Sequence, residues 1–204
     1  MRTSTNDGHR QVLVVCTANI ARSPLVAAVL GGHVRLRGLD AHIEVCSAGI
    51  ATRRDDPAAE PTVEIARRWG LALEEHRSQP VTDELLATSD LVVTMTERQR
   101  DHCSARGRGI GTRCFTLPEL ARLLDSAELA DLPAHLPARF DDAILAAHRT
   151  RPFSSATGEQ DVDDPYGRAY EHYVVMANRI AGLLMTVSEA LLGPAPTADG
   201  HPLA

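Results

Sequence analysis

The sequence predicts an α/β fold, in which a four-stranded parallel sheet is flanked by helices on both faces of a single, flavodoxin-like domain. Short apolar runs alternate with helical patterns along the chain, and this alternation is typical of a parallel sheet. The chain has 204 residues and is 44% hydrophobic, which is enough for one domain with a buried core. The first apolar run, residues 12–15, leads through a short loop directly into a helical pattern.

Four segments are predicted as strands because they are short and either wholly apolar or alternating. Wholly apolar runs are typical of strands that are buried on both faces. The second segment alternates, and Gly49 follows it closely. The predicted strands are residues 12–15, 43–45, 91–95 and 114–117.

Helices are predicted where start and stop signals bracket a polar and apolar pattern. Gly38 and Gly70 each follow the end of such a pattern, and Thr96 with Gln99 forms a capping box. The last helix has an apolar stripe at helical spacing, which predicts a face packed on the core. The predicted helices are residues 24–37, 61–69, 83–88, 97–103, 119–125, 138–148 and 168–192.

The loop between the first strand and the first helix has the composition of an anion site. Ser23 followed by Pro24 predicts the helix start, with the serine as its cap. Loop amides and a helix N-terminus attract an anion, and the same field favours the thiolate of Cys16. The Arg22 guanidinium is suited to bind two oxygens of a tetrahedral oxyanion, and Ser23 to donate a hydrogen bond to the sulfur.

The predicted chemistry is attack of Cys16 on a phosphoryl group, with the anion held by the loop that follows it. The spacing of Cys16 and Arg22 carries weight because it lies between a strand and a helix start. The predicted phosphate-binding residues are Thr17, Ala18, Asn19, Ile20, Ala21, Arg22 and Ser23.

This loop resembles the low-molecular-weight protein tyrosine phosphatase family, whose signature is Cys-x-Gly-Asn-x-Cys-Arg-Ser. Ala18 stands where the family has glycine, and Ala21 where many members have a second cysteine that traps the oxidised nucleophile as a disulfide. The resemblance covers most of the chain and implies the fold of phosphotyrosine phosphatase I. The matching positions are Cys16, Asn19, Arg22, Ser23 and Pro24.

The resemblance also implies where the catalytic acid and the domain boundaries lie. The family carries its acid in an Asp-Pro-Tyr loop before the final helix, and the matching residue is Asp164. Tyr166 and Arg53 are the candidate residues of the substrate pocket, whereas Asp161 and Asp163 are interpreted as a solvated acidic turn. The phosphatase domain is predicted at 11–193, with an insertion at 126–160 because the family is generally shorter there, and with flexible tails at 1–10 and 194–204.

The predicted activity is hydrolysis of phosphotyrosine in proteins through a phosphocysteine intermediate, without cofactor or metal. Inorganic phosphate and other tetrahedral oxyanions are expected to bind in the loop. Bacterial members of the family often oppose the tyrosine kinases of polysaccharide export, so such a kinase is a candidate partner.

Composition excludes several other classes of protein. All 21 basic residues are arginine, which excludes a Walker A loop, a pyridoxal Schiff base and a protein-kinase site, since each needs a lysine. The net charge of −6 argues against nucleic-acid binding. The polar N-terminus resembles no secretory signal, and no run approaches the roughly 20 apolar residues of a membrane span. A cytoplasmic protein is therefore expected.

Three alternatives share this loop. Thiol-coupled arsenate reductases need two further cysteines, but Thr96 occupies the first relay position, although Cys103 and Cys114 remain. Protein arginine phosphatases have threonine at this position of the loop. This chain has Ile20 there, as tyrosine phosphatases have isoleucine. A phosphate-binding module without turnover is the third, and the intact catalytic set argues against it.

Overall fold

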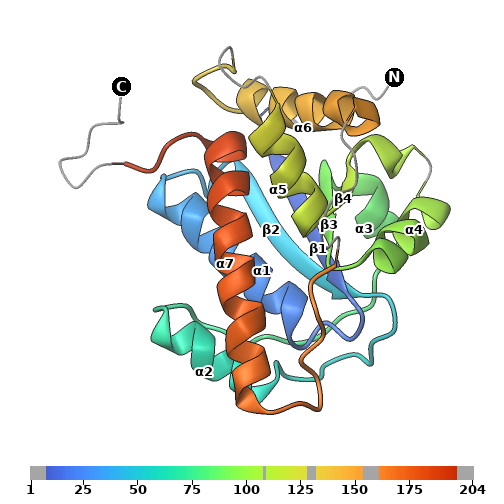
Figure 1. Ribbon diagram of the computed structural model, residues 1–204, viewed down its shortest axis with the longest axis vertical. Coiled ribbons are helices and arrows are strands. Elements are labelled where there is room, and N and C mark those ends of the chain that lie inside the picture. The colour runs from blue at the N-terminus through green and yellow to red at the C-terminus, as the bar shows by residue number, and fades with distance from the viewer. Residues whose placement is uncertain (1–7, 108, 128–131, 154–160, 197–204) are drawn as a thin grey trace.

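The computed structural model describes residues 8–107, 109–127, 132–153 and 161–196. Its centre is a parallel sheet with the strand order β2-β1-β3-β4, which confirms the predicted fold class (Figure 1). The strand order reverses beside β1, and open α/β sheets bind ligands at the carboxyl ends of strands at such a point. The strands are β1 (Arg10–Cys16), β2 (Ile43–Gly49), β3 (Leu91–Thr94) and β4 (Cys114–Thr116).

Helices cover both faces of the sheet. Because side chains alternate along a strand, Val14 and Cys16 of β1 lie in one core, and Leu13 and Val15 lie in the other. The first core is completed by α1 (Arg22–Leu36), α2 (Glu60–Arg68), α5 (Leu117–Ser126), α6 (Ala138–Thr150) and α7 (Tyr170–Leu192). The second core is covered by α3 (Asp83–Thr88), α4 (Glu97–Arg106) and the 3-10 turn η1 (Ile110–Thr112).

The N-terminal boundary of the domain differs from its prediction. The predicted tail ended at residue 10, whereas Arg10 opens β1 and donates its backbone N–H to the His42 carbonyl at 2.7 Å. Its guanidinium forms an ion pair with Asp141 of α6 at 2.7 Å. A polar residue at a strand end gives no apolar signal, so the pattern missed it. Residues 1–7 and 197–204 of the predicted tails lie outside the described residues.

The described part of the predicted insertion packs against the core. Helix α6 lies across α5 and α7 at the upper end of the view, and Phe140 and Ala147 are among its fully buried residues (Figure 1). The 3-10 turn η2 (Arg151–Phe153) follows it. Arg151 binds the buried Glu119 carboxylate at 2.9 Å and the Cys114 carbonyl at 2.8 Å, which fastens this segment to β4 and α5.

Helix α7 is long and apolar enough to cross a membrane by length and composition alone, which the sequence-based estimate did not recognise. In the fold it packs against α1, α5 and α6. Its buried stripe includes Tyr173, Ile180, Leu184 and Val187, as the helical spacing predicted. This burial is the pattern of a core helix.

Candidate active site

The loop that joins β1 to α1 places the cysteine sulfur among hydrogen-bond donors. Cys16 is the last residue of β1, and its Sγ accepts from the Ser23 hydroxyl at 3.0 Å and from the Asn19 backbone N–H at 3.2 Å. The predicted bond from Ser23 to sulfur is confirmed. These donors stabilise negative charge on the sulfur, because hydrogen bonds to an ionised acceptor are the strong ones.

The predicted start of the first helix was wrong by two residues. Helix α1 begins at Arg22, after Ala21, and no side chain caps it. Ser23 therefore lies inside the first turn rather than at the cap. Its hydroxyl faces Cys16 and the Ala48 carbonyl, so the residue that resembled a cap positions the nucleophile instead.

Asn19 holds the shape of the loop. It has a left-handed backbone with φ of 57°, a conformation that asparagine tolerates. Its side-chain amide donates to the Ser23 and Ser47 hydroxyls, each at 2.9 Å, and its side-chain oxygen accepts from the Gln79 N–H at 3.0 Å. The His76 Nε2–H donates to the Asn19 carbonyl at 2.7 Å. Burial lowers the pKa of His76, which favours the neutral ring.

Ala18 is compatible with this loop because the left-handed position falls on Asn19 and not on Ala18. The close approach is made by Gly49, at the end of β2. A Cβ on Gly49 would lie 2.6 Å from the Thr17 carbonyl oxygen, so a larger residue would displace the loop. The next residue, Ile50, donates its N–H to the Cys16 carbonyl at 3.0 Å and fixes the two loops together.

Arg22 is buried and links the loop to the segment before α7. Its Nη1 donates to the Val162 carbonyl at 3.2 Å and its Nη2 to the Thr17 hydroxyl at 3.4 Å, and Nη2 also forms an ion pair with Asp164. Within the described residues, its Nε is buried and makes no hydrogen bond. The Nε and Nη2 edge is the part of a guanidinium that binds an oxyanion through two parallel hydrogen bonds.

The acidic turn before α7 divides into residues with different roles. Asp164 meets Arg22 through one carboxylate oxygen and accepts the Tyr166 backbone N–H through the other at 3.2 Å. Asp161 instead accepts the Glu97 N–H at 2.8 Å, at the start of α4. Of these two acids, only Asp164 contacts the loop, and its role as the acid stays a prediction.

The two candidate pocket residues remain a prediction. Arg53 is exposed in the loop after β2, where its carbonyl accepts from the Thr52 hydroxyl at 2.8 Å and the Ser78 hydroxyl at 2.6 Å. Tyr166 is 67% exposed and donates its backbone N–H to Asp164. In these contacts both residues use their backbones, so the contacts do not place either side chain at the sulfur.

Gln99 is a site residue that the sequence pattern identified only as part of a capping box. That box is present, and the buried amide of Gln99 also donates to the Thr17 hydroxyl at 3.0 Å. Its oxygen accepts the Met95 N–H at 2.9 Å, and the Met95 carbonyl accepts the Val162 N–H at 2.7 Å. Gln99 therefore connects the loop, through the end of β3, to the segment that carries Asp164. The position of the box directly after a central strand is the signal that could have suggested this.

These side chains suit an anion rather than a metal ion. The guanidinium of Arg22, the loop N–H groups and the N-terminus of α1 all favour negative charge. Within the described ranges, no group of three or more His, Cys, Asp or Glu side chains could hold a metal ion.

The other three cysteines lie far from Cys16. Cys46 pairs in register with Leu13, three residues before Cys16, which is about 10 Å along the strand. Cys114 lies in the same row on β4, and Cys103 packs in the core on the opposite face of the sheet from Cys16. A disulfide needs Cα atoms within about 7 Å, so the relay of a thiol-coupled arsenate reductase is not supported.

Peroxide is expected to carry Cys16 past sulfenic acid to sulfinic acid, because no second thiol is within reach to trap it. Burial also raises the pKa of Cys46 to about 11 and that of Cys103 to about 12, so both remain protonated at neutral pH. After long exposure, dithiothreitol should restore only part of the activity, and peptide mass spectrometry should find the sulfinic acid on Cys16.

The matched control is Ala21→Cys, which supplies the second cysteine of the signature that this loop resembles. This variant should form a disulfide with Cys16 and recover more activity with thiol than the natural chain does. A dominant disulfide between Cys16 and Cys46, Cys103 or Cys114, with full recovery, would contradict the prediction.

Comparison with known proteins agrees with this geometry. The family model described as low molecular weight phosphotyrosine protein phosphatase matches residues 11–133, which include the Cys16 loop but not Asp164. A probable low molecular weight protein-tyrosine-phosphatase, EpsP, of Ralstonia nicotianae is 30% identical over 69% of this chain and 90% of its own length. A low molecular weight protein-tyrosine-phosphatase of Streptomyces coelicolor is 28% identical over 91% of this chain and 98% of its own length.

Two further similarities bear on fold and substrate. The protein-arginine-phosphatase of Bacillus subtilis is 32% identical over 53% of this chain and 70% of its own length. The solved low molecular weight protein tyrosine phosphatase from T. tengcongensis superposes with a TM-score of 0.66 at 24% identity, over 88% of this chain and 98% of that one. With the nucleophile loop lying inside the matched residues, this chain belongs to the low molecular weight phosphotyrosine protein phosphatase family.

Proposed function

We propose that this enzyme hydrolyses phosphotyrosine in proteins through a phosphocysteine formed on Cys16. The proposal rests chiefly on one observation: the Cys16 sulfur accepts hydrogen bonds from Ser23 and Asn19 within a loop that Arg22 closes. The buried Nε–H of Arg22 then supplies a hydrogen-bond donor for the anion, and the Asp164 carboxyl group supplies the proton that such a reaction needs.

In the first step the thiolate attacks phosphorus, and the bond from phosphorus to the phenolic oxygen breaks. The equatorial oxygens bind to the loop amides and to the Nε and Nη2 edge of Arg22. The anion displaces Asp164 from Nη2 of Arg22, and Asp164, which enters this step as the carboxylic acid, passes its proton to the leaving oxygen. The products of this step are phosphocysteine, a phenol and an Asp164 carboxylate.

In the second step Asp164 takes a proton from water, and the water oxygen attacks phosphorus. The bond from sulfur to phosphorus breaks, which releases inorganic phosphate and restores the thiolate. Ser23 and Asn19 stabilise the departing sulfur through the two hydrogen bonds already described. The cycle needs no cofactor.

A structural neighbour shows that this fold can hold a tetrahedral phosphonate. Wzb of Vibrio vulnificus, in complex with benzylphosphonate, superposes with a TM-score of 0.63 at 21% identity, over 89% of this chain. Benzylphosphonate carries a tetrahedral phosphonate on an aromatic side group, as phosphotyrosine carries a phosphate. At this identity the likeness concerns the fold, and the site residues carry the rest of the proposal.

The second candidate substrate is phosphoarginine, because of the similarity to the Bacillus subtilis arginine phosphatase. Ile20 decides between them in our proposal. It lies half-buried in the loop, where its carbonyl accepts the Ala59 N–H at 2.8 Å. A branched apolar side chain there is expected to crowd a guanidinium-linked phosphate and to favour a flat aromatic ring.

The ratio of kcat/KM for a phosphotyrosine peptide to that for a matched phosphoarginine peptide should therefore exceed one. In Ile20→Thr this ratio of kcat/KM values should fall by roughly tenfold, because the loss of one methylene from an apolar pocket changes kcat/KM by at least about that factor. Both peptides are assayed by release of inorganic phosphate. A natural chain that prefers phosphoarginine would refute the tyrosine assignment while leaving phosphatase activity intact.

We propose cytoplasmic phosphotyrosine proteins as the substrates, with a bacterial tyrosine kinase as the candidate partner. The support is the family itself, which acts on phosphorylated proteins. Capture of tyrosine-phosphorylated proteins on immobilised Cys16→Ser, with release by vanadate, tests this. Captured proteins that lack phosphotyrosine would overturn the assignment.

A further inference from the structure

We propose that a cavity between the Asp164 loop and α7 binds an apolar side chain of the substrate protein that lies close to the phosphotyrosine. The inference rests on the proposed function and extends it to how the enzyme chooses among phosphotyrosine sites. The cavity has a volume of about 160 Å³.

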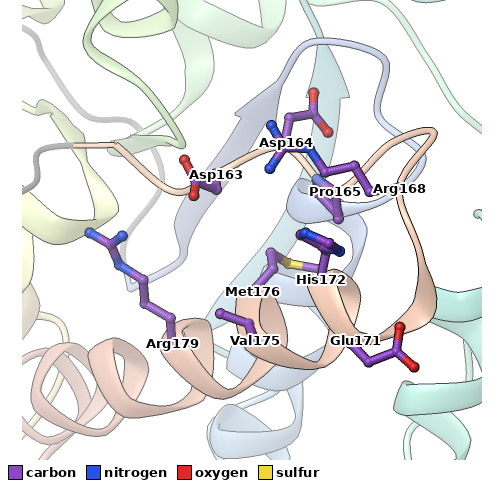
Figure 2. Close-up of a pocket in the computed structure, with 9 residues that line it drawn as sticks. All are labelled: Asp163, Asp164, Pro165, Arg168, Glu171, His172, Val175, Met176 and Arg179. Atoms are coloured by element: carbon purple, nitrogen blue, oxygen red, sulfur yellow. The ribbon is translucent and has the colours of Figure 1, made fainter.

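The lining of the cavity combines apolar side chains with charged side chains around its rim. The apolar residues are Pro165 of the Asp164 loop and Met176 of α7, which are buried, and Val175 of α7, which is 69% exposed; His172 of α7 also lines the cavity. Figure 2 shows Val175 and Met176 on α7 below the loop that carries Asp164 and Pro165, with Arg168 at one end and Arg179 rising from α7 at the other.

The cavity and the catalytic centre share one residue, Asp164. This residue lines the cavity and also contacts Arg22, where the phosphate is proposed to bind. An extended peptide advances at most about 3.5 Å per residue, so a side chain within about three positions of the phosphotyrosine can reach the cavity. A peptide bound at Cys16 therefore brings its neighbouring residues to this opening.

The chemistry of the cavity selects an apolar occupant. Asp164 is paired with Arg22, and the other acids of the lining, Asp163 and Glu171, balance Arg168 and Arg179. The rim therefore gives no preference for one sign of charge. Covering the exposed Val175 with an apolar side chain removes apolar surface of both partners from water, which favours binding.

The test compares phosphotyrosine peptides that differ at one position. Leucine, serine and aspartate are placed in turn at each position from three before to three after the phosphotyrosine, in an otherwise constant sequence. At one position the kcat/KM for the leucine peptide should exceed that for the serine peptide by roughly tenfold. The difference should appear in KM, because Val175 and Met176, which would contact the leucine, lie on α7 and take no part in the proposed reaction.

The variant Val175→Asp should bring the leucine-to-serine ratio at that position close to one. The matched control is Met185→Asp, also on α7 and 62% exposed, which lies about 15 Å further along the helix. This control should keep the ratio of the natural chain. Because each ratio is taken within one enzyme, differences in folding or in the active fraction cancel.

Three results would overturn the proposal: no position at which leucine is preferred, a preference for aspartate over leucine, or a ratio that survives in Val175→Asp. Failure of the function itself looks different. In that case the natural chain would release no phosphate from any of the peptides or from p-nitrophenyl phosphate, and the subsite would fall with it.

Discussion

Cys16→Ser is expected to lose essentially all turnover of p-nitrophenyl phosphate while it still binds phosphate and vanadate. A serine hydroxyl is a weak nucleophile at neutral pH, whereas the thiolate attacks phosphorus directly. The hydroxyl can replace sulfur in the bonds from Ser23 and Asn19, so the loop and the fold should persist. Binding is measured by isothermal titration with vanadate, and folding by the thermal unfolding midpoint.

The matched control for this variant is Cys46→Ser. Cys46 is half-buried on β2, three residues back from the row that contains Cys16, and burial raises its pKa to about 11. Removing its sulfur should leave turnover close to that of the natural chain. Turnover of Cys16→Ser within tenfold of the natural chain, with the fold intact, would rule out Cys16 as the nucleophile.

The sequence predicted the features that depend on local order. Apolar runs and helical patterns located all four strands and the described helices, because the strands are buried between two layers of helices and each helix turns an apolar face to a core. The Cys16 loop was found for the same reason, since its cysteine and arginine lie at the junction of a strand and a helix. The hydrogen bond from Ser23 to the Cys16 sulfur could also be predicted, because the two residues are only seven positions apart in the same loop region.

The remaining features depend on contacts between distant parts of the chain. His76 and Gln79 support Asn19 across about 60 positions, and no local pattern indicates that a histidine will meet a loop carbonyl. The start of α1 was misplaced because Ser23 followed by Pro24 resembles a cap whether its hydroxyl faces the helix or a sulfur. The capping box accounts for Gln99 locally, so its second contact, with Thr17, was missed although the position of the box directly after a central strand could have suggested it.

Asp164→Ala is expected to lower kcat by about 10²–10⁴ with a phosphotyrosine peptide, the usual contribution of a positioned acid. Asp164 touches Arg22, which is proposed to bind the phosphate, so its carboxyl lies where a leaving oxygen would form. Without that proton the phenol must leave as a phenolate. The substitution also removes the ion pair between Asp164 and Arg22, which joins the Cys16 loop to the segment before α7. The fold of the variant is therefore checked by thermal unfolding.

The size of the loss should depend on the leaving group. A phenolate whose parent phenol has a low pKa leaves without help, so the loss should shrink from phosphotyrosine to p-nitrophenyl phosphate and further with more acidic phenols. The logarithm of kcat against the pKa of the leaving phenol should therefore be steep for Asp164→Ala and shallow for the natural chain. If hydrolysis of the phosphocysteine limits kcat, phenol is released in an initial burst. The rate of that burst then gives the first step separately.

Asp163→Ala identifies which neighbour is the acid. Asp163 precedes Asp164 and lines the cavity toward α7, so its loss should lower kcat much less and should leave the shallow dependence on the leaving group. Asp164 differs from it because Arg22 and the Tyr166 N–H hold its two oxygens toward the nucleophile loop. A larger loss in Asp163→Ala, with the steep dependence, would transfer the role of acid to Asp163 and require the segment before α7 to move when phosphate binds.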